Sequence, residues 1–286
     1  TEALRGARKI FAPGNVQLSS YLLGLALLYE KTGSYTEAIQ LQEQSQLLLK
    51  NRYGTEFPDY IAGLINLAVL HRHCNRPESA DTLLGQALQI LEQTNKTKTS
   101  MYPWALAQLG ELYQYTKQYE RARPILEKAA QLGEQLAGKD HPAHYRVHGE
   151  ALIRQEILEN RPDTALSLLD QMATTVLNAY GDRHERYISL QAQYGTVWQM
   201  KGDAEKALKH FQLAFNALQQ NLAENFRFLS VDEREKFARV FEAYHMAFLS
   251  FARTFPHEPA IQSFLYDLLL FQKELLASYD RQLLTI

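Results

Sequence analysis

The histidines and the single cysteine are the residues of this sequence that could bind a metal ion or act in catalysis. His144 and His148 are four residues apart, so a helix would place them on one face, with His141 about one turn earlier. Imidazoles arranged in this way could bind a zinc ion, which normally needs three convergent ligands and supporting partners. No suitably spaced carboxylate completes this set. We therefore expect no metal site.

The single cysteine, Cys74, has no predicted general base beside it, so we expect it to pack as a small buried hydrophobic residue. The sequence also lacks the glycine-rich phosphate loop, the dinucleotide-binding turn and the nucleophile elbow. Acidic residues are numerous, but they lie where solvated helix faces are expected. We expect no catalytic residue and no cofactor in this span, which would then not be an enzyme.

The amino-acid composition indicates which kind of partner this chain could bind. Hydrophobic residues make up 46% and charged residues 22% of the 286 positions, as in a folded globular protein. The 30 basic and 32 acidic residues are well mixed, which argues against a nucleic-acid binder. No stretch approaches the roughly 20 apolar residues of a membrane span. One cysteine excludes an internal disulfide and favours a reducing, cytoplasmic location. These observations favour a protein partner.

The sequence repeats with a period of 42 residues, and the repeated elements would position any site. Small residues recur at this interval through most of the chain, with one interval of 43. The main series runs Ala38, Ala80, Ala122, Ala165 and Ala207, with Ser45, Ala87 and Ala129 as a second series.

Within one unit the spacing predicts two helices. Leu25, Ala26 and Tyr29 form an apolar stripe on a first helix, and Gly33 can adopt the left-handed conformation that ends it. A second stripe runs through Tyr35, Ala38 and Ser45. Small side chains let two helix backbones approach closely. Each unit is therefore predicted to be a helix, a tight turn and an antiparallel helix.

This pattern resembles the tetratricopeptide repeat, most clearly at Leu109, Gly110, Tyr113, Tyr119 and Ala122. The resemblance implies an all-α fold, a right-handed α-solenoid of antiparallel helix hairpins. Some units depart from the pattern without losing the expected hairpin. Asn75 and Asn160 replace the turn glycine, His71 and Glu156 replace the tyrosine, and Pro77 and Pro162 replace the second aromatic residue at the first helical turn, where a missing N–H costs nothing.

The long period and the connectors resemble the subclass of repeats found in kinesin light chains. Tyr53-Gly54, the segment 138–142 and the segment 180–184 are similar to its glycine and histidine-proline junction. Five units span about residues 17–224. We expect a repeat solenoid over residues 1–224.

The 42-residue register is lost from Asn225, although helical periodicity continues. Ser230 to Glu233 is typical of a capping box that opens a helix through about Thr254, and Pro256 and Pro259 separate it from a last helix. A solenoid needs terminal elements with one face for water. Residues 225–286 are therefore predicted to form C-terminal capping or linker helices.

Three segments of this C-terminal part resemble the stretch between repeats and catalytic domain in CHAT proteins, which are caspase-like cysteine peptidases. They are residues 225–230, residues 233–237, and Leu265-Tyr266-Asp267 continuing through residues 272–276, where Glu274 replaces a glycine common in that family. The similarity covers roughly residues 210–283. The peptidase itself is not in this span, so the resemblance implies a regulatory or sensor region of a larger enzyme.

Tetratricopeptide domains commonly bind a peptide in the groove lined by the first helix of each repeat, and the register assigns residues to it here. Amide and arginine side chains in such a groove can satisfy a peptide backbone or pair with acidic side chains. Some of these residues could instead be ordinary exposed helix residues. The candidates are Asn66, Arg72, Gln108, Glu111, Tyr115, Glu150, Arg154, Gln193 and Gln199.

Three functions are compatible with these observations. The first is a protein-interaction scaffold that binds a peptide or protein and regulates a downstream CHAT-type peptidase domain. The second is a free-standing adaptor similar to kinesin light chains. The third is a regulator that senses a short signalling peptide, as bacterial quorum receptors do. None of them involves nucleic acid or a membrane at this span.

Overall fold

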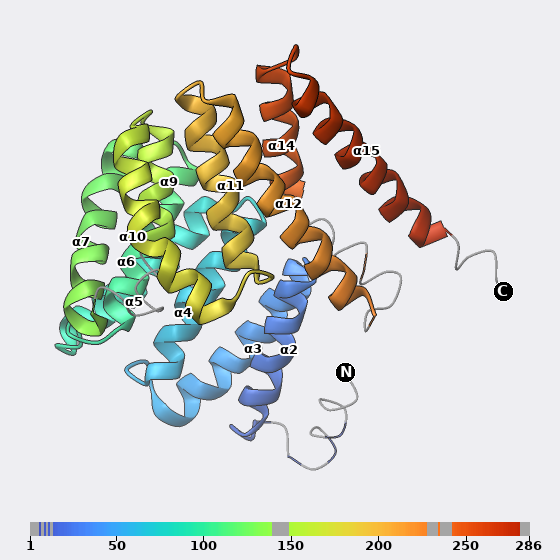
Figure 1. Cartoon of the computed structure of the whole chain (residues 1–286). Helices are drawn as coiled ribbons and strands as arrows, with labels where there is room; N and C mark the ends of the chain where they lie inside the picture. Colours follow the sequence, from blue (N-terminus) through green and yellow to red (C-terminus); the bar gives the residue numbers. More distant parts are fainter. Residues whose placement is uncertain are drawn as a thin grey trace. The chain divides into compact units, whose positions relative to one another are not determined.

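The computed structural model describes residues 14–138, 149–227 and 242–280, together with residues 6, 9, 11 and 234. In these ranges the chain forms twelve α-helices and no strand (Figure 1). The all-α prediction is confirmed. The helices are α2 (Leu18–Lys31), α3 (Tyr35–Tyr53), α4 (Pro58–His73), α5 (Pro77–Gln93), α6 (Met101–Tyr115), α7 (Tyr119–Ala137), α9 (Glu150–Leu158), α10 (Pro162–Tyr180), α11 (Glu185–Met200), α12 (Ala204–Phe226), α14 (Glu242–Thr254) and α15 (Pro259–Asp280).

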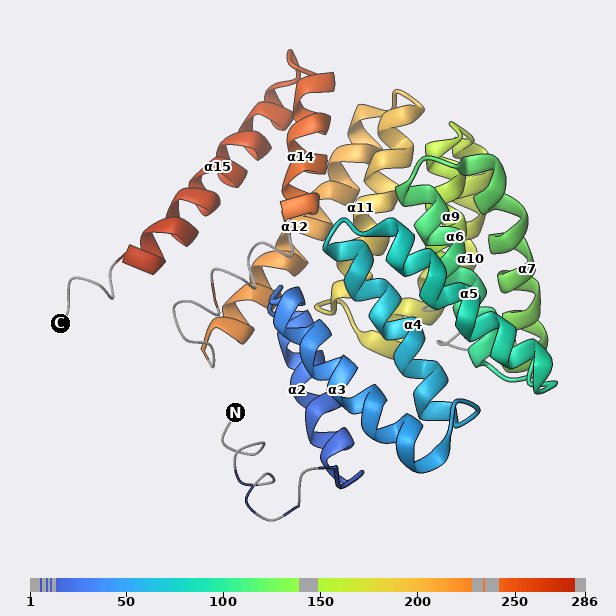
Figure 2. The same cartoon turned by 180° about the vertical axis from the view of Figure 1, so that it is seen from behind.

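The chain divides into two compact units, residues 1–155 and 156–286. In the first unit, α2 pairs with α3, α4 with α5, and α6 with α7, each as an antiparallel hairpin (Figure 2). In the second unit, α11 and α12 form an equivalent hairpin, and α14 packs against both α11 and α15. The expected division at residues 224 and 225 remains a prediction.

The repeating small residues lie in the helix interfaces, as predicted. Ala38, Ala80, Ala122, Ala165 and Ala207 are all at most 1% exposed. The second series is buried as well, at Ser45, Ala87 and Ala129. A side chain larger than alanine at these positions would force the packed helices apart, because interiors are already close-packed.

The turn inside each hairpin uses a residue with a positive φ. The expected left-handed conformation is present at Gly33, with φ 74°, and at Asn75 and Asn160, with φ near 57°. The third hairpin places Lys117 there, with φ 59°, although the pattern did not single it out. The fifth uses Gly202. Because a β-carbon is strained in this region, the lysine carries a cost that glycine avoids.

Two glycines on first helices permit close approach of the second helix. A β-carbon at Gly110 would collide with the side chain of Leu126, and one at Gly195 would lie 2.8 Å from the ring of Phe211. Leu126 and Phe211 are themselves fully buried. The hairpins α6–α7 and α11–α12 therefore depend on the missing side chain at these two positions.

Buried amide side chains join successive hairpins in the first unit. Gln46 of α3 donates to the carbonyl oxygen of Tyr60 at the start of α4, at 2.8 Å. Gln114 of α6 donates to the carbonyl oxygen of Ala151 in α9, at 2.9 Å. Gln155 donates in turn to the carbonyl oxygen of Tyr119. The accepting oxygens all lie in the first turn of their helices, so each bond fixes one helix to the start of a neighbouring one.

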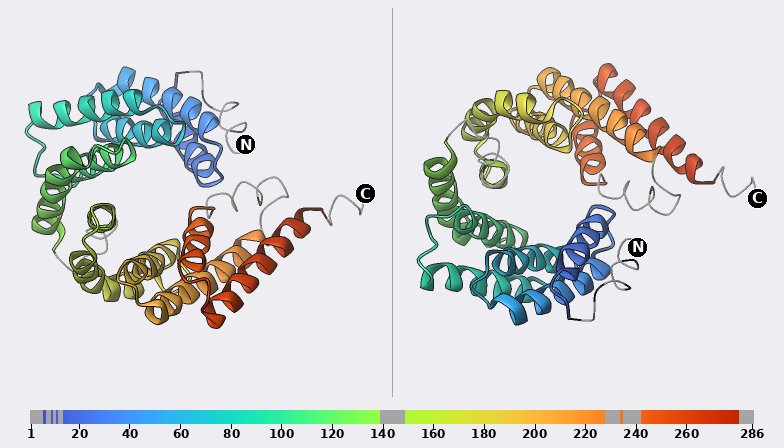
Figure 3. Two further views of the ribbon diagram at one scale, coloured as in Figure 1. Left: turned by 90° about the horizontal axis from the view of Figure 1, so that it is seen from above. Right: turned by 90° about the horizontal axis from the view of Figure 1, so that it is seen from below.

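The C-terminal helices share a core with α12 (Figure 3). Phe211 and Phe215 of α12 contact Phe248 and Phe251 of α14 and Phe264 of α15, with ring centroids 4.8–6.0 Å apart. The predicted break at Pro256 and Pro259 is confirmed, because α14 ends before it and α15 begins at Pro259. The predicted capping box at residues 230–233 lies outside the described residues. The capping role itself stays a prediction.

Candidate functional site

Seven of the nine candidate groove residues lie on first helices in the first unit. α4, α6 and the start of α9 carry them at helical spacing, and six of the seven are partly buried, Tyr115 being exposed. They are Asn66, Arg72, Gln108, Glu111, Tyr115, Glu150 and Arg154.

An ion pair joins two of these residues across neighbouring hairpins. Nη1 of Arg72 on α4 lies 2.7 Å from Oε2 of Glu111 on α6, and each side chain is less than one-fifth exposed. Burial alone would raise the pKa of Glu111. The positive charges of Arg72 and Arg154, with the hydrogen bond from Arg72, outweigh it and hold the pKa below its usual value. Glu111 is therefore ionised at neutral pH.

A second bond joins the exposed Tyr115 of α6 to the turn that follows α4. Its hydroxyl donates to Oδ1 of Asn75 at 2.8 Å. Asn75 was expected only as a turn residue, so its contact with Tyr115 was missed. The signal was present, because an asparagine that replaces glycine at a left-handed turn also brings a polar side chain.

Glu150 and Arg154 form an i, i+4 pair on α9, with Nη2 and Oε1 3.9 Å apart. The Arg154 side chain is 43% exposed, and its charge acts on Glu111 of the adjacent helix α6. Arg72, Glu111, Glu150 and Arg154 thus bring two positive and two negative charges together, and Arg154 is the most exposed side chain of the four.

The amides of the first unit flank this charged group. Asn66 on α4 and Gln108 on α6 are partly exposed, and neither has a hydrogen bond to another residue that the structure describes. Each can both donate and accept. Such side chains suit the alternating N–H and C=O groups of a peptide backbone.

The remaining two candidates belong to α11 in the second unit. Nε2 of Gln199 donates to Oγ1 of Thr254 in α14 at 2.7 Å, so this side chain already has a partner. Oε1 of Gln193 is buried without a hydrogen bond from the described residues. A groove role for either residue remains a prediction.

The histidine and cysteine candidates differ in whether the structure describes them. His141, His144 and His148 lie outside the described residues. Cys74 is half-buried and packs beside the apolar cluster around Ala38 and Leu67. Within the described ranges, no group of three histidine, cysteine or acidic side chains could hold a metal ion. No helix there is long and apolar enough to cross a membrane.

Family models of the tetratricopeptide repeat match residues 2–93 and 104–143. The chain contains tetratricopeptide repeats. This confirms the resemblance inferred from the 42-residue period, and it covers all the hairpins of the first unit. No curated protein matches the sequence.

Solved tetratricopeptide structures share the fold at low sequence identity. TPR-like repeats of a protein from Podosopora anserina described as a kinesin light chain are 20% identical, with a TM-score of 0.54, over 73% of this chain and 97% of that one. BtubC (BKLC) from P. vanneervenii is 13% identical, with a TM-score of 0.60, over 88% and 92%. The Rap protein complexed with competence and sporulation factor is 16% identical, with a TM-score of 0.62, over 92% and 66%. The predicted similarity to kinesin light chains is confirmed at the level of the fold.

Proposed function

We propose that this tetratricopeptide repeat protein is an interaction scaffold that binds a peptide or protein segment along the first helices of its first unit. The observation that carries the proposal is the row of polar side chains on α4, α6 and α9, linked by Arg72 and Glu111. This salt bridge joins separate hairpins, and each of its side chains is less than one-fifth exposed. The row is ordered before any partner arrives, which lowers the entropic cost of binding.

The chemistry of the row favours a segment with an acidic group. Arg154 can pair with a carboxylate through two parallel N–H groups, while Glu150 limits how much negative charge is tolerated nearby. Asn66 and Gln108 can hold the backbone of the same segment. We place this binding in a reducing compartment such as the cytoplasm, because the chain has one cysteine.

The test is a double substitution, Arg154→Ala with Glu150→Ala, in an affinity pull-down quantified by mass spectrometry. The matched control is Arg123→Ala with Glu127→Ala, another i, i+4 pair, on the second helix α7. We expect the α9 variant to lose partners that both wild type and control retain. Thermal unfolding should change little in either, because each pair has one side chain in contact with solvent and such surface ion pairs contribute only about 0–1 kcal/mol.

Loss of the same partners from both variants would contradict a site on the first helices. A large fall in the unfolding temperature of the α9 variant would place Arg154 and Glu150 in the core instead.

We further infer that the chain is the regulatory region of a CHAT-type caspase-like peptidase. The similarity of residues 210–283 supports this, and part of it falls on α15, including Leu265, Tyr266 and Asp267. A partner on the repeats would then shift the population of states available to a downstream catalytic domain. The reading frame beyond Ile286 tests the idea: a domain with a catalytic histidine and cysteine supports it. A stop codon rejects it in favour of a free-standing adaptor.

A peptide-sensing regulator is the alternative that one comparison favours. The similar Rap protein structure contains competence and sporulation factor. For this chain, a DNA-binding or other output domain encoded before Thr1 would support the alternative.

A further inference from the structure

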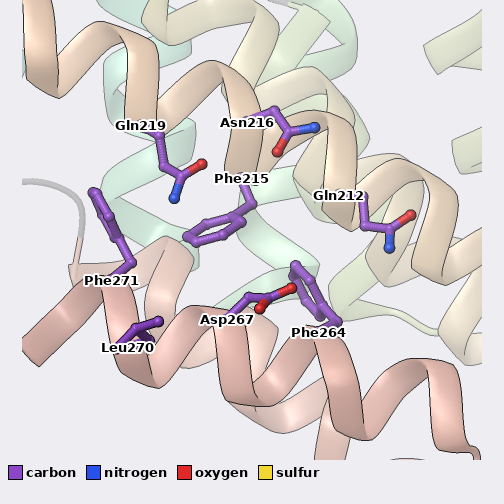
Figure 4. Close-up of a pocket in the computed structure, with 8 residues that line it drawn as sticks. All are labelled: Gln212, Phe215, Asn216, Gln219, Phe264, Asp267, Leu270 and Phe271. Atoms are coloured by element: carbon purple, nitrogen blue, oxygen red, sulfur yellow. The ribbon is translucent and has the colours of Figure 1, made fainter.

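A cleft in the second unit lies between α12 and α15, which are the second helices of their hairpins (Figure 4). Its volume is about 520 Å³, within the range of about 300–1,000 Å³ typical of ligand sites. It therefore differs from the proposed binding row, which lies on first helices of the other unit. The residues that line it are Gln212, Phe215, Asn216, Gln219, Phe264, Asp267, Leu270 and Phe271.

Aromatic and aliphatic side chains form the floor of the cleft. The ring of Phe215 packs edge-on against Phe264 and against Phe271, with centroids 5.6 and 5.5 Å apart. Phe215 and Phe264 are almost fully buried, whereas Leu270 is 43% exposed. The floor is closely packed in its centre and uncovered at its edge, so the edge can accept one further large apolar side chain.

Three amides line the α12 wall. Gln212, Asn216 and Gln219 follow one another at i, i+4 and i+7, so they share one face of the helix. None of them has a hydrogen bond with the residues that the structure describes. Gln212 and Asn216 are separated by a helical rise of about 6 Å, close to the roughly 6.6–6.8 Å covered by two residues of an extended chain. These two amides can therefore meet successive backbone groups on one edge of an extended peptide, whereas Gln219 lies only about 4.5 Å further along the helix.

The α15 wall contributes one charge. Asp267 lies between Phe264 and Leu270 along the cleft, and it has no ion pair with the described residues (Figure 4). Among the described residues that line the cleft, none is basic. A cationic ligand group is favoured, and phosphate or nucleic acid is not.

We propose that this cleft binds an extended segment of a partner protein in which an arginine or lysine accompanies a large apolar side chain. The cation pairs with Asp267, the apolar side chain covers Leu270 and Phe271 at the uncovered edge, and the amides of α12 hold the backbone. Binding here does not require the proposed function of the first unit.

The test uses three fluorescein-labelled octapeptides of serine and alanine and measures their binding to the full chain by fluorescence polarisation. The first peptide carries phenylalanine and, two positions later, arginine. Glutamate replaces the arginine in the second, and alanine replaces the phenylalanine in the third. We expect the first to bind about tenfold more tightly than either of the others.

Substitutions locate the binding. Asp267→Lys should reverse the preference between the arginine and glutamate peptides, while Glu134→Lys, an equal charge change on the exposed face of α7, should not. Gln212→Ala with Asn216→Ala should weaken the arginine peptide about fivefold and keep the preference for arginine. All lie at exposed helix positions, so circular dichroism should show folded variants.

Three results would overturn the proposal. The first is equal affinity of wild type for all three peptides, or no binding of any. The second is an Asp267→Lys variant that is folded and still prefers arginine. The third is loss of binding in the Arg154→Ala, Glu150→Ala variant, which would place the peptide on the first helices and so support the proposed function instead.

Discussion

Arg72 and Glu111 are 39 positions apart in sequence, yet Nη1 of one donates to Oε2 of the other at 2.7 Å and so bridges α4 and α6. Removing the charge with Glu111→Gln should leave Arg72 partly buried without its counter-ion. We expect the free energy of unfolding to fall by about 1–3 kcal/mol at pH 7. Urea denaturation measures this, with the exposed Glu127→Gln as control.

The same pair predicts a pH dependence. The pKa of Glu111 is lower in the folded protein than its ordinary value near 4.5, so its contribution is fully present above that value. It is lost as the pH falls through the folded pKa. The stability difference between wild type and Glu111→Gln should therefore shrink in acid. A difference that stays constant down to the acid transition would contradict the assignment.

The left-handed turn at Lys117 can be improved. Lys117→Gly should stabilise the protein by about 0.5–1 kcal/mol, because glycine adopts a φ of 59° without strain. The reverse change at the equivalent turn, Gly202→Ala, should destabilise by about 1 kcal/mol. No atom lies within 4 Å of that added β-carbon, so the backbone alone accounts for the cost. Thermal denaturation of both variants checks the opposite signs.

The close approach in the third hairpin gives a steric prediction. Gly110→Ala should destabilise by about 1–3 kcal/mol, because the new methyl group meets Leu126. Gly85→Ala is the matched control: it also lies inside a helix but meets no atom, so it should be neutral or stabilising. If chemical denaturation showed equal effects of the two changes, helix propensity, and not the packing of α6 on α7, would determine the change in stability.

His210 should make the second unit sensitive to mild acid. Burial, and secondarily Lys209, lower its pKa from the ordinary 6.5, although Asp170 opposes this. The ring stacks on Tyr194 at 4.7 Å and its Nδ1 lies 2.7 Å from Oε1 of Gln191. The contribution of neutral His210 to the stability of the fold is fully present above pH 6.5, and it is lost as the pH falls through the lowered pKa. His210→Gln should flatten the decline between pH 7 and 5, measured by thermal unfolding.

Local periodicity predicted the elements because its physical causes are local. The small residues Ala38 and Ala122 and the turn residues Asn75 and Asn160 have roles that depend on the conformation of one hairpin, and the structure confirms them. Lys117 was missed because a sequence pattern identifies residues that favour the left-handed conformation, such as glycine and asparagine. Lysine can adopt this conformation but does not favour it.

The candidate site was predictable only in part. The register placed Arg72, Glu111 and Arg154 on first helices, but not the bond between the first two, which depends on how neighbouring hairpins stack. Their role in binding is still a prediction. The cleft between α12 and α15 was missed altogether, because the repeat register ends before α15 and so gives no indication of how α15 packs on α12.

The buried glutamines make each hairpin fit only its own neighbour in the array. Gln46 of α3 bonds to Tyr60, whereas the equivalent position of α5 is Leu88, which packs in an apolar cluster. A chimaera with these hairpins exchanged would set an amide against a surface shaped for leucine, and would remove the hydrogen bond that Gln46 donates to Tyr60. The array is therefore not a set of interchangeable modules, and transplanting hairpins should fail unless each junction is moved along with them.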